Sequence, residues 1–451
     1  MKISNIDDTI CAIATGGGIS AIAIIRISGK DAIRITNNIF SKNLEKVKSH
    51  TIHLGDIKDG EDIIDEVLIS IFKENKSYTG EETIEISCHG SNYIQNKILR
   101  LLINNGCRMA NAGEFTLRAF KNGKIDLSQA ESVADLIASD SKSEQQVAIK
   151  QLKGGFSNKL KELRNKLIDF ASLIELELDF SEEDVEFADR NKFYNLLTEI
   201  KNEISYLLES FNLGNVIKNG IPVSIIGPPN VGKSTLLNSL LNDDRAIVSE
   251  IAGTTRDTIE DKLIINGINF RFIDTAGIRN TKDKIENLGI KRTFDKAKKS
   301  EIILYLIDAS KEIEKQIKNL EKIQKDNPGK YIVIINKIDV NGNIKNIKDA
   351  IYISAKKEIG IDKLKEKLID LTNQSKLSNN ETIVTNIRHY EELTLTLQEI
   401  NSIIEGLDNN ISGEFLSINI RQALLHIGSI TGEISNDTLL GNIFSKFCIG
   451  K

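Results

Sequence analysis

Hydrophobic and polar positions alternate along this chain in patterns that divide it into three regions. In the first region, the apolar run at 22–27 predicts a mostly buried strand, and the alternation over 82–87 predicts a half-exposed one. Glycines 16–18 precede these runs, whereas a dinucleotide-binding glycine motif follows a strand and opens a helix. The glycines therefore predict a flexible turn. We assign an α/β domain to residues 1–119.

The second region carries a helical pattern. Apolar residues recur mostly at spacings of three and four, which places them on one face of a long helix. The stripe comprises Leu160, Leu163, Leu167, Phe170, Ala171, Ile174 and Leu178. The acidic run at 182–186 fits a solvated helix end or loop better than a metal site. We assign residues 120–215 to the first part of a helical domain.

The third region alternates strand-like runs with helical stretches. The runs lie at 223–226, 270–273, 302–307 and 331–335. This alternation is typical of a doubly wound, mostly parallel sheet, and we assign it to residues 216–378. The polar stretch 373–380 then marks a linker, and residues 379–451 are again helical but too short to form a core alone. We expect this tail to pack on residues 120–215, so that the sheet domain is an insertion in a helical domain.

Composition narrows the class of protein. The 451 residues include 59 Lys and Arg against 64 Asp and Glu, and the net charge of −5 argues against a protein that coats nucleic acid. The four cysteines form no CxxC pair, which argues against a disulfide scaffold or a structural zinc site. No apolar run reaches the roughly 18 residues of a membrane span, and the N-terminus lacks signal-peptide features. We expect a soluble, cytoplasmic protein that does not use a membrane.

The chain contains one strong phosphate-binding motif. Residues 227–234 fit GxxxxGKS between a predicted strand and a predicted helix. Backbone N–H groups of such a loop converge on phosphate oxygens, and the helix N-terminus adds to their attraction. Lys233 is expected to reach the β- and γ-phosphates, and the Ser234 hydroxyl to bind Mg²⁺.

Three further elements identify the nucleotide as GTP. In the segment 274–277, the Asp would hold the magnesium shell and the Gly N–H would sense the γ-phosphate. In the segment 336–339, Asp339 can accept hydrogen bonds from both the ring N–H and the exocyclic amine of guanine, which adenine does not offer. The segment 354–356 would complete the base pocket with a backbone N–H. A threonine between these elements would give magnesium a second hydroxyl, but spacing alone does not choose between Thr254 and Thr255.

The sequence lacks the side chain that commonly orients the attacking water. Many small GTPases carry glutamine after the DTAG glycine, and here that position is Ile278. Another group must position water, and another cation must offset the developing charge. Arg279, Asp283 and Glu286 are candidates, although Asp283 fits a solvated loop charge better.

Beyond these motifs, the chain resembles the MnmE (TrmE) family, bacterial tRNA-modification GTPases, over essentially its whole length. Besides the GTPase motifs, the matching segments are 25–29, 78–81, 113–120 and the terminal CIGK at 448–451. The resemblance implies an N-terminal domain that forms a homodimer and binds 5-formyl-tetrahydrofolate or a related one-carbon folate. It further implies that, with the FAD-dependent partner MnmG (GidA), the protein adds an aminomethyl-type group to C5 of the wobble uridine of certain tRNAs.

The resemblance also implies roles for particular residues. A K⁺ site maps to Asn230, Ser249, Ile251 and Thr254. Thr255 maps to the magnesium-binding threonine, and Glu286 to the glutamate that orients the hydrolytic water. Folate contacts map to Arg26, Glu85, Lys124 and Lys451. Cys448 maps to the cysteine that tRNA modification requires, although a free cysteine is often only a small buried hydrophobe. With the motifs above, the residues assigned to GTP are Asn230, Val231, Gly232, Lys233, Ser234, Thr235, Ser249, Thr254, Thr255, Asp274, Thr275, Ala276, Gly277, Asn336, Lys337, Asp339, Ser354, Ala355 and Lys356.

A second class of function uses the same GTPase motifs. A GTP-dependent switch in ribosome or RNA assembly would bind RNA and transfer no group. The N-terminal region and Cys448 favour the modification enzyme, and no basic RNA-binding module is visible in the sequence.

Overall fold

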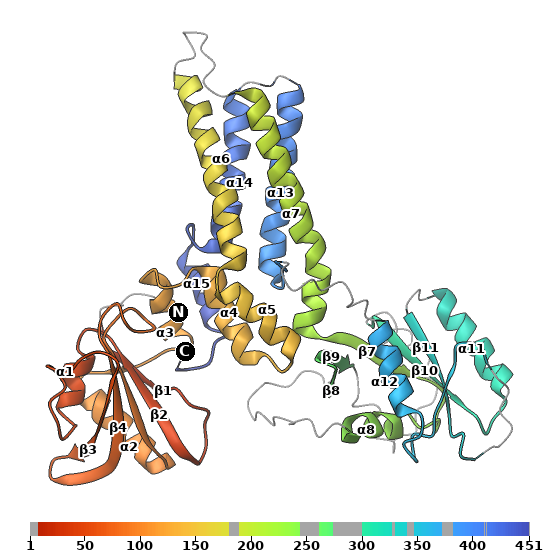
Figure 1. Cartoon of the computed structure of the whole chain (residues 1–451), viewed down its shortest axis with the longest axis horizontal. Helices are drawn as coiled ribbons and strands as arrows, with labels where there is room; N and C mark the ends of the chain where they lie inside the picture. Colours follow the sequence, from red (N-terminus) through yellow and green to blue (C-terminus); the bar gives the residue numbers. More distant parts are fainter. Residues whose placement is uncertain are drawn as a thin grey trace. The chain divides into compact units, whose positions relative to one another are not determined.

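A computed structural model of the chain describes residues 8–179, 189–243, 261–273, 300–326, 330–340, 347–371, 382–409, 411 and 413–450 (Figure 1). The chain forms two compact units. The first comprises Met1–Ile137, Ile149–Ser205 and Glu391–Lys451, and the second comprises Ala138–Ala148 and Tyr206–Tyr390.

The first unit begins with a six-stranded sheet in the order β3-β4-β5-β2-β1-β6. Its strands are β1 Ile10–Ile13, β2 Ser20–Ser28, β3 Thr51–Asp59, β4 Asp62–Phe72, β5 Thr83–Gly90 and β6 Arg108–Met109. Neighbours are antiparallel except for β1 and β6. Helices α1 (Ala32–Asn37) and α2 (Asn92–Asn104) bury one face of the sheet, because their apolar residues join its core. The predicted α/β domain is confirmed.

The glycines at 16–18 lie in a hairpin loop. β1 precedes them and pairs with β2 in antiparallel register, from Ile10 opposite Ser28 to Ile13 opposite Ile25. The expectation that no strand precedes the glycines was therefore wrong, because four residues are too few to show a periodic pattern. The predicted turn stands, since a strand and not a helix follows the glycines.

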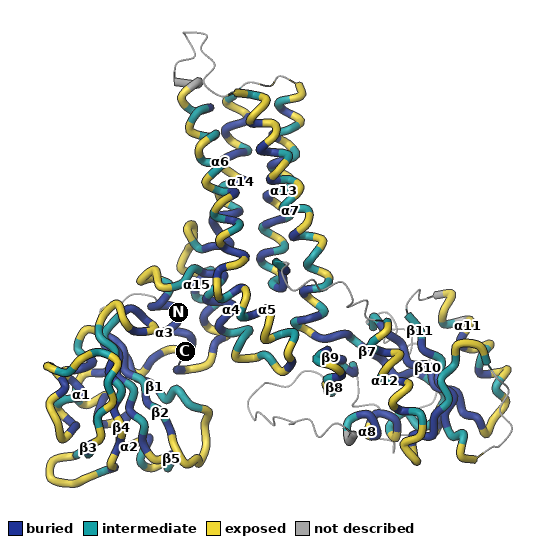
Figure 2. Tube along the Cα trace, in the orientation of Figure 1, coloured by how far each residue is buried: buried dark blue, intermediate teal, exposed yellow. Residues whose placement is uncertain are grey.

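Helices from before and after the second sheet build the rest of the first unit. They are α3 Glu114–Lys121, α4 Leu127–Ala138, α5 Lys142–Leu152, α6 Gly155–Asp179, α7 Arg190–Asn219, α13 Ile387–Asp408, α14 Gly413–Thr431 and α15 Asp437–Phe444. The boundaries between the two units fall within α4, α5, α7 and α13, so parts of these four helices belong to the second unit. α6 packs along α14, and Leu160, Leu163, Leu167 and Ile174 of the stripe predicted for α6 are buried (Figure 2). Phe170 of α6 stacks on Phe193 of α7, with ring centroids 5.0 Å apart. The Nδ1 atom of His426 in α14 lies 2.7 Å from the Oε2 atom of Glu392 in α13. The predicted packing of the C-terminal tail on the first helical part is confirmed.

The second unit contains a sheet in the order β12-β11-β10-β7-β9-β8. The strands are β7 Ile221–Ile226, β8 Asp261–Ile265, β9 Ile268–Phe272, β10 Ile302–Asp308, β11 Lys330–Asn336 and β12 Ile351–Tyr352. All pairs are parallel except β8 with β9. The apolar runs predicted as strands are β7, β9, β10 and β11.

Helices cover both faces of this sheet. Leu236 of α8 (Lys233–Asp243) and Leu364 of α12 (Ile361–Asp370) share one core with Leu304 of β10. Leu320 of α11 (Ile313–Asp326) lies in another core with Tyr305 of β10. Since successive residues of β10 belong to different cores, the sheet is doubly wound, as predicted. Among the described residues, no helix is long and apolar enough to cross a membrane.

Candidate functional site

The candidate nucleotide site lies where parallel strands of the second unit end. β7 leads directly into residues 227–232, after which α8 begins at Lys233. In the sheet register, Asp308 at the end of β10 pairs with Asn336 at the end of β11. Because the carboxyl ends of parallel strands meet at one edge of a sheet, the loops that follow them converge there.

The phosphate loop adopts backbone conformations that suit glycine. Gly232 has a φ of 101°, and a Cβ placed there would lie 2.4 Å from Asn336 Nδ2. Lys233 folds back over the loop, and its Nζ donates to the carbonyls of Gly227 (2.8 Å) and Pro228 (2.9 Å). Ser234 and Thr235 follow in the first turn of α8, where Ser234 is half-buried and Thr235 is exposed. The predicted phosphate-binding residues are therefore grouped around one turn.

Asn336 connects three segments of the site. Its side chain is 2% exposed, and its Nδ2 donates to the Val231 carbonyl at 2.8 Å. Its Oδ1 accepts from the Ala355 N–H at 3.0 Å. The amide thus joins the phosphate loop to both predicted guanine segments, which brings residues of three sequence motifs into one site.

The Asp339 carboxylate is held in its charged form. The Ser354 hydroxyl donates to its Oδ1 at 2.7 Å, and this hydrogen bond lowers the pKa of Asp339 below its ordinary value. Ser354 is buried and Asp339 is exposed, and Lys356 is exposed two residues further on. An ionised Asp339 can only accept hydrogen bonds, which is the property that recognition of guanine requires.

The sequence reasoning missed one residue of this site, Asp308. Its Oδ2 lies 2.7 Å from Lys337 Nζ, which also donates to the Asn230 carbonyl at 2.7 Å. Burial raises the pKa of Asp308, but the hydrogen bonds from Lys337 and Ser310 outweigh burial and lower it overall. An acidic residue at the end of an apolar run, at 302–307, was the sequence signal that could have revealed it.

Several predicted site residues lie outside the described residues. They are Ser249, Ile251, Thr254, Thr255, Asp274, Thr275, Ala276, Gly277, Glu286 and Lys451. The same holds for Ile278, Arg279, Asp283 and the acidic run at 182–186. Their assignments stay predictions.

The first unit brings together two of the predicted folate residues. Arg26 of β2 and Glu85 of β5 are direct partners in the sheet register. The Glu85 Oε1 atom accepts from Arg26 Nε at 2.9 Å and lies 2.8 Å from Arg26 Nη2. The guanidinium carbon lies 5.8 Å from the Tyr78 ring centroid and 5.7 Å from that of Phe115. The Arg26–Glu85 ion pair therefore lies beside two aromatic rings.

The C-terminal tail lies against this pair. Arg26 Nη1 donates to the Gly450 carbonyl at 3.2 Å, and the Gly113 N–H donates to the Cys448 carbonyl at 3.3 Å. Cys448 is exposed, whereas the other three cysteines are buried. The predicted folate residue Lys124 donates to the Asn75 carbonyl at 3.0 Å. The tail therefore belongs to the same region as Arg26 and Glu85.

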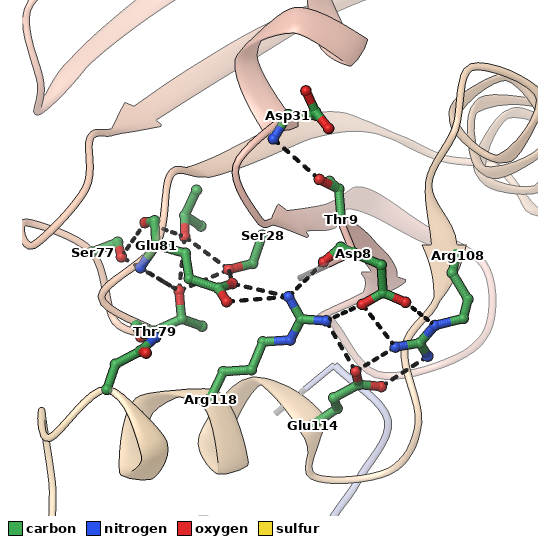
Figure 3. Close-up of polar contacts among 12 residues, drawn as sticks. Asp8, Thr9, Ser28, Asp31, Ser77, Thr79, Glu81, Arg108, Glu114 and Arg118 are labelled. Atoms are coloured by element: carbon green, nitrogen blue, oxygen red, sulfur yellow. Dashed lines mark hydrogen bonds and ion pairs between the residues drawn. The ribbon is translucent and has the colours of Figure 1, made fainter. Parts of the chain in front are cut away.

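An ionic network around the buried Arg118 supports the loop that carries Tyr78 (Figure 3). Arg118 is 1% exposed and contacts Asp8 at 2.6 Å, and Glu81 and Glu114 at 3.2 Å each. Arg108 also contacts Asp8 and Glu114, both at 2.6 Å. Burial raises the pKa values of Asp8 and Glu114, but the two arginines more than offset burial and lower both. This network fixes Glu81, three residues after Tyr78.

Comparisons with known proteins identify the family of this chain. The model "MnmE helical domain" matches residues 127–448, and "GTP-binding protein TrmE N-terminus" matches residues 9–124. The chain belongs to the MnmE family. The tRNA modification GTPase MnmE of Flavobacterium psychrophilum is 57% identical, over 98% of this chain and 99% of that protein. The protein of the same name from Christiangramia forsetii is 55% identical, over 99% of this chain and 100% of that protein.

A more distant relative and a solved structure complete the comparison. The tRNA modification GTPase MnmE of Bacteroides fragilis is 52% identical, over 98% of this chain and 99% of that protein. A solved FeoB G-domain from Methanococcus jannaschii is 22% identical and covers 34% of this chain and 96% of that chain. Its TM-score is 0.25, so the family assignment rests on the full-length relatives and the two family models.

Proposed function

We propose that this protein is a potassium-activated GTPase that acts with the FAD-dependent partner MnmG (GidA). Together they add an aminomethyl-type group to C5 of the wobble uridine in certain tRNAs. The protein is a GTP hydrolase that takes part in tRNA modification. The observation that carries the finer proposal is that a guanine-nucleotide site and a second polar site occur in one chain. The second site includes the tail that bears Cys448, and a simple assembly switch needs only the first.

GTP and Mg²⁺ would be held at the ends of the parallel strands. Lys233 and the N–H groups of the phosphate loop would bind the phosphates, and Asp339 would bind the guanine. The Ser234 hydroxyl is a hard oxygen ligand next to the phosphate-binding lysine, which suits Mg²⁺. Thr255 would provide a second hydroxyl, and Asp274 would hold the magnesium shell.

A potassium ion would replace a catalytic side chain. The Ile278 side chain cannot orient the attacking water through a hydrogen bond. Catalysis also requires positive charge near the transferred phosphoryl group, and a bound K⁺ would supply it. The proposed ligands are Asn230, Ser249, Ile251 and Thr254. The backbone carbonyl of Asn230 accepts from Lys337 and the residue itself is exposed at a φ of 60°, so a solution cation can reach its side chain. Glu286 would orient the hydrolytic water.

A one-carbon folate, such as 5-formyl-tetrahydrofolate, would bind beside the C-terminal tail and supply a one-carbon unit. The Glu85 carboxylate can accept hydrogen bonds from a pterin ring, and Arg26 can pair with a carboxylate. Tyr78 and Phe115 add aromatic surface next to both charges. Lys124 and Lys451 would contribute further positive charge, and the exposed Cys448 would act in the modification of tRNA.

The outward face of the N-terminal sheet supports a homodimer. Leu54 of β3 and Leu68 of β4 are direct cross-strand partners and are 51% and 45% exposed. Ile52 and Ile22, at 65% and 62%, extend this apolar surface along the same face. An exposed apolar patch of this kind marks an interaction site, and a twofold symmetric dimer would bury the same patch of both copies.

The proposal is tested by mass analysis of wobble uridine in a strain that lacks this protein. We expect the modified nucleoside to disappear, and to return with the parent protein but not with Cys448→Ser. Purified Cys448→Ser should hydrolyse GTP at the parent rate, because residue 448 belongs to the first unit and the nucleotide site is built from residues of the second. Unchanged modification in the deletion strain would favour the assembly switch instead.

A further inference from the structure

Asp308 has an environment that fixes its carboxylate in one position. It is 1% exposed at the end of β10. The Ser310 N–H and hydroxyl donate to its Oδ1 at 3.0 and 2.6 Å. The Gln316 side chain accepts from the Asp308 N–H at 2.9 Å and donates to its carbonyl at 3.1 Å. A buried carboxylate with this many fixed partners can hold a mobile side chain in place.

The side chain that Asp308 holds is Lys337. Its ammonium lies 2.7 Å from Asp308 Oδ2 and 2.7 Å from the Asn230 carbonyl. Lys337 also has a φ of 68°, a left-handed conformation that non-glycine residues rarely adopt. Such strain persists only where the surroundings determine the conformation, and it concentrates at functional sites.

The three residues connect two loops that bind different parts of one ligand. Lys337 belongs to the loop after β11, which carries Asp339, and Asn230 belongs to the phosphate loop. Asp308 itself belongs to neither loop, because it ends β10, and its carboxylate oxygens are paired with Ser310 and Lys337.

We propose that Asp308 is a positioning residue of the GTP site. By holding the Lys337 ammonium on the Asn230 carbonyl, it keeps the guanine loop and the phosphate loop in the spacing that one GTP molecule requires. Without the charge of Asp308, Lys337 leaves the phosphate loop, and binding of the base no longer preorganises the loop for the phosphates. Affinity for GTP then falls, while the bound nucleotide is still hydrolysed at the parent rate.

The direct test is Asp308→Asn in the full-length protein, since this change keeps the shape of the side chain and removes its charge. We expect the KM for GTP and the Kd for a fluorescent GDP analogue to rise about 10- to 100-fold, the range for a hydrogen bond to a charged group. At saturating K⁺, the kcat should stay within twofold of the parent. A KM within twofold of the parent would overturn the proposal. Glu312→Gln, an exposed charge four residues along the chain, is the matched control and should change neither constant.

A double-mutant cycle separates positioning from general damage to the fold. If Asp308 acts through Lys337, then Asp308→Asn combined with Lys337→Met raises the KM no more than Lys337→Met alone. Multiplied effects of the two changes would overturn the proposal. If Asp308→Asn does not fold, Ser310→Ala replaces it, because it removes one donor to Asp308 and keeps the ion pair. We expect it to raise the KM about 2- to 5-fold, and an unchanged KM would count against the proposal.

A further measurement, the K⁺ dependence of GTP hydrolysis, concerns the proposed potassium site and therefore rests on the proposed function. Because Lys337 fixes the backbone of Asn230, Asp308→Asn should raise the K⁺ concentration that half-activates hydrolysis. A parent protein that K⁺ does not activate would contradict the potassium proposal and leave the KM test in force. A K⁺-activated parent whose half-activating concentration is the same in Asp308→Asn would contradict the link to Asn230.

Discussion

The two polar sites of this protein are assembled in different ways. The nucleotide site combines loops that follow neighbouring parallel strands, so that Asp308 and Asn336 meet because their strands are in register. The Arg26 site instead joins the N-terminal sheet to the end of the chain, and Arg26 and Gly450 are 424 positions apart in sequence. The first kind of site is a consequence of sheet topology, whereas the second depends on tertiary packing of the tail.

The largest effect is expected at Asp339 of the nucleotide site. Asp339→Asn replaces an acceptor-only group with an amide that presents a donor to guanine, so kcat/KM for GTP should fall by roughly 10⁴. Steady-state GTP hydrolysis measures this. Asp362→Asn, at the start of α12, is the control and should retain the parent value. A loss of less than tenfold would remove Asp339 from guanine recognition.

The same contrast explains what could be predicted from sequence. β7, β10 and β11 were predictable because their apolar runs are long, and the nucleotide residues because each motif directly follows a strand. β1 has only four residues, and no periodicity revealed it. The contact of Gly450 with Arg26 was not predictable from pattern, because no local rule pairs residues so distant in sequence. Asp308 was missed because its role depends on the loops that surround it.

Breaking the ionic network near the Arg26 site should affect stability and leave GTP hydrolysis intact. Arg118→Met leaves the carboxylates of Asp8, Glu81 and Glu114 without their shared cation, and removing one partner of a buried ionic cluster costs about 3–5 kcal/mol. Denaturant unfolding of the first unit measures this loss. Arg34→Met, in an exposed pair with Asp31, should leave the unfolding midpoint unchanged. Equal midpoints for the two variants would show that the network does not stabilise the domain.

Acid should weaken the first unit through the same network. The folded pKa values of Asp8 and Glu114 lie below their ordinary values of 3.8 and 4.5. Their stabilisation is therefore fully present above about pH 4.5 and is lost as the pH falls through the lower, folded values. Unfolding followed from pH 7 to pH 2 should show this loss in the parent and a shallower dependence in Arg118→Met. Parallel pH profiles would contradict this account.

The smallest effect is expected from a substitution in the C-terminal tail, measured as a change in folate affinity. Gly450 has a φ of 99°, and an added Cβ would lie 2.4 Å from the Ile13 carbonyl oxygen. Gly450→Ala should shift the tail from Arg26 and weaken binding of 5-formyl-tetrahydrofolate about 3- to 10-fold, through backbone strain of the usual size. Calorimetric titration measures this, and Gly60→Ala, at a left-handed loop glycine with open space around it, controls for strain alone. Parent-like affinity for Gly450→Ala would mean that the tail does not shape the proposed folate site.

We propose that a cation from solution does the work of a catalytic side chain in this GTPase. The most direct measurement is GTP turnover by the full-length protein at saturating GTP and Mg²⁺, in KCl and in NaCl of equal ionic strength. We predict hydrolysis more than about tenfold faster in KCl, because a cation beside the transferred phosphoryl group stabilises its developing charge. Asn230→Ala should abolish this difference. Equal rates for the parent in the two salts would contradict the claim.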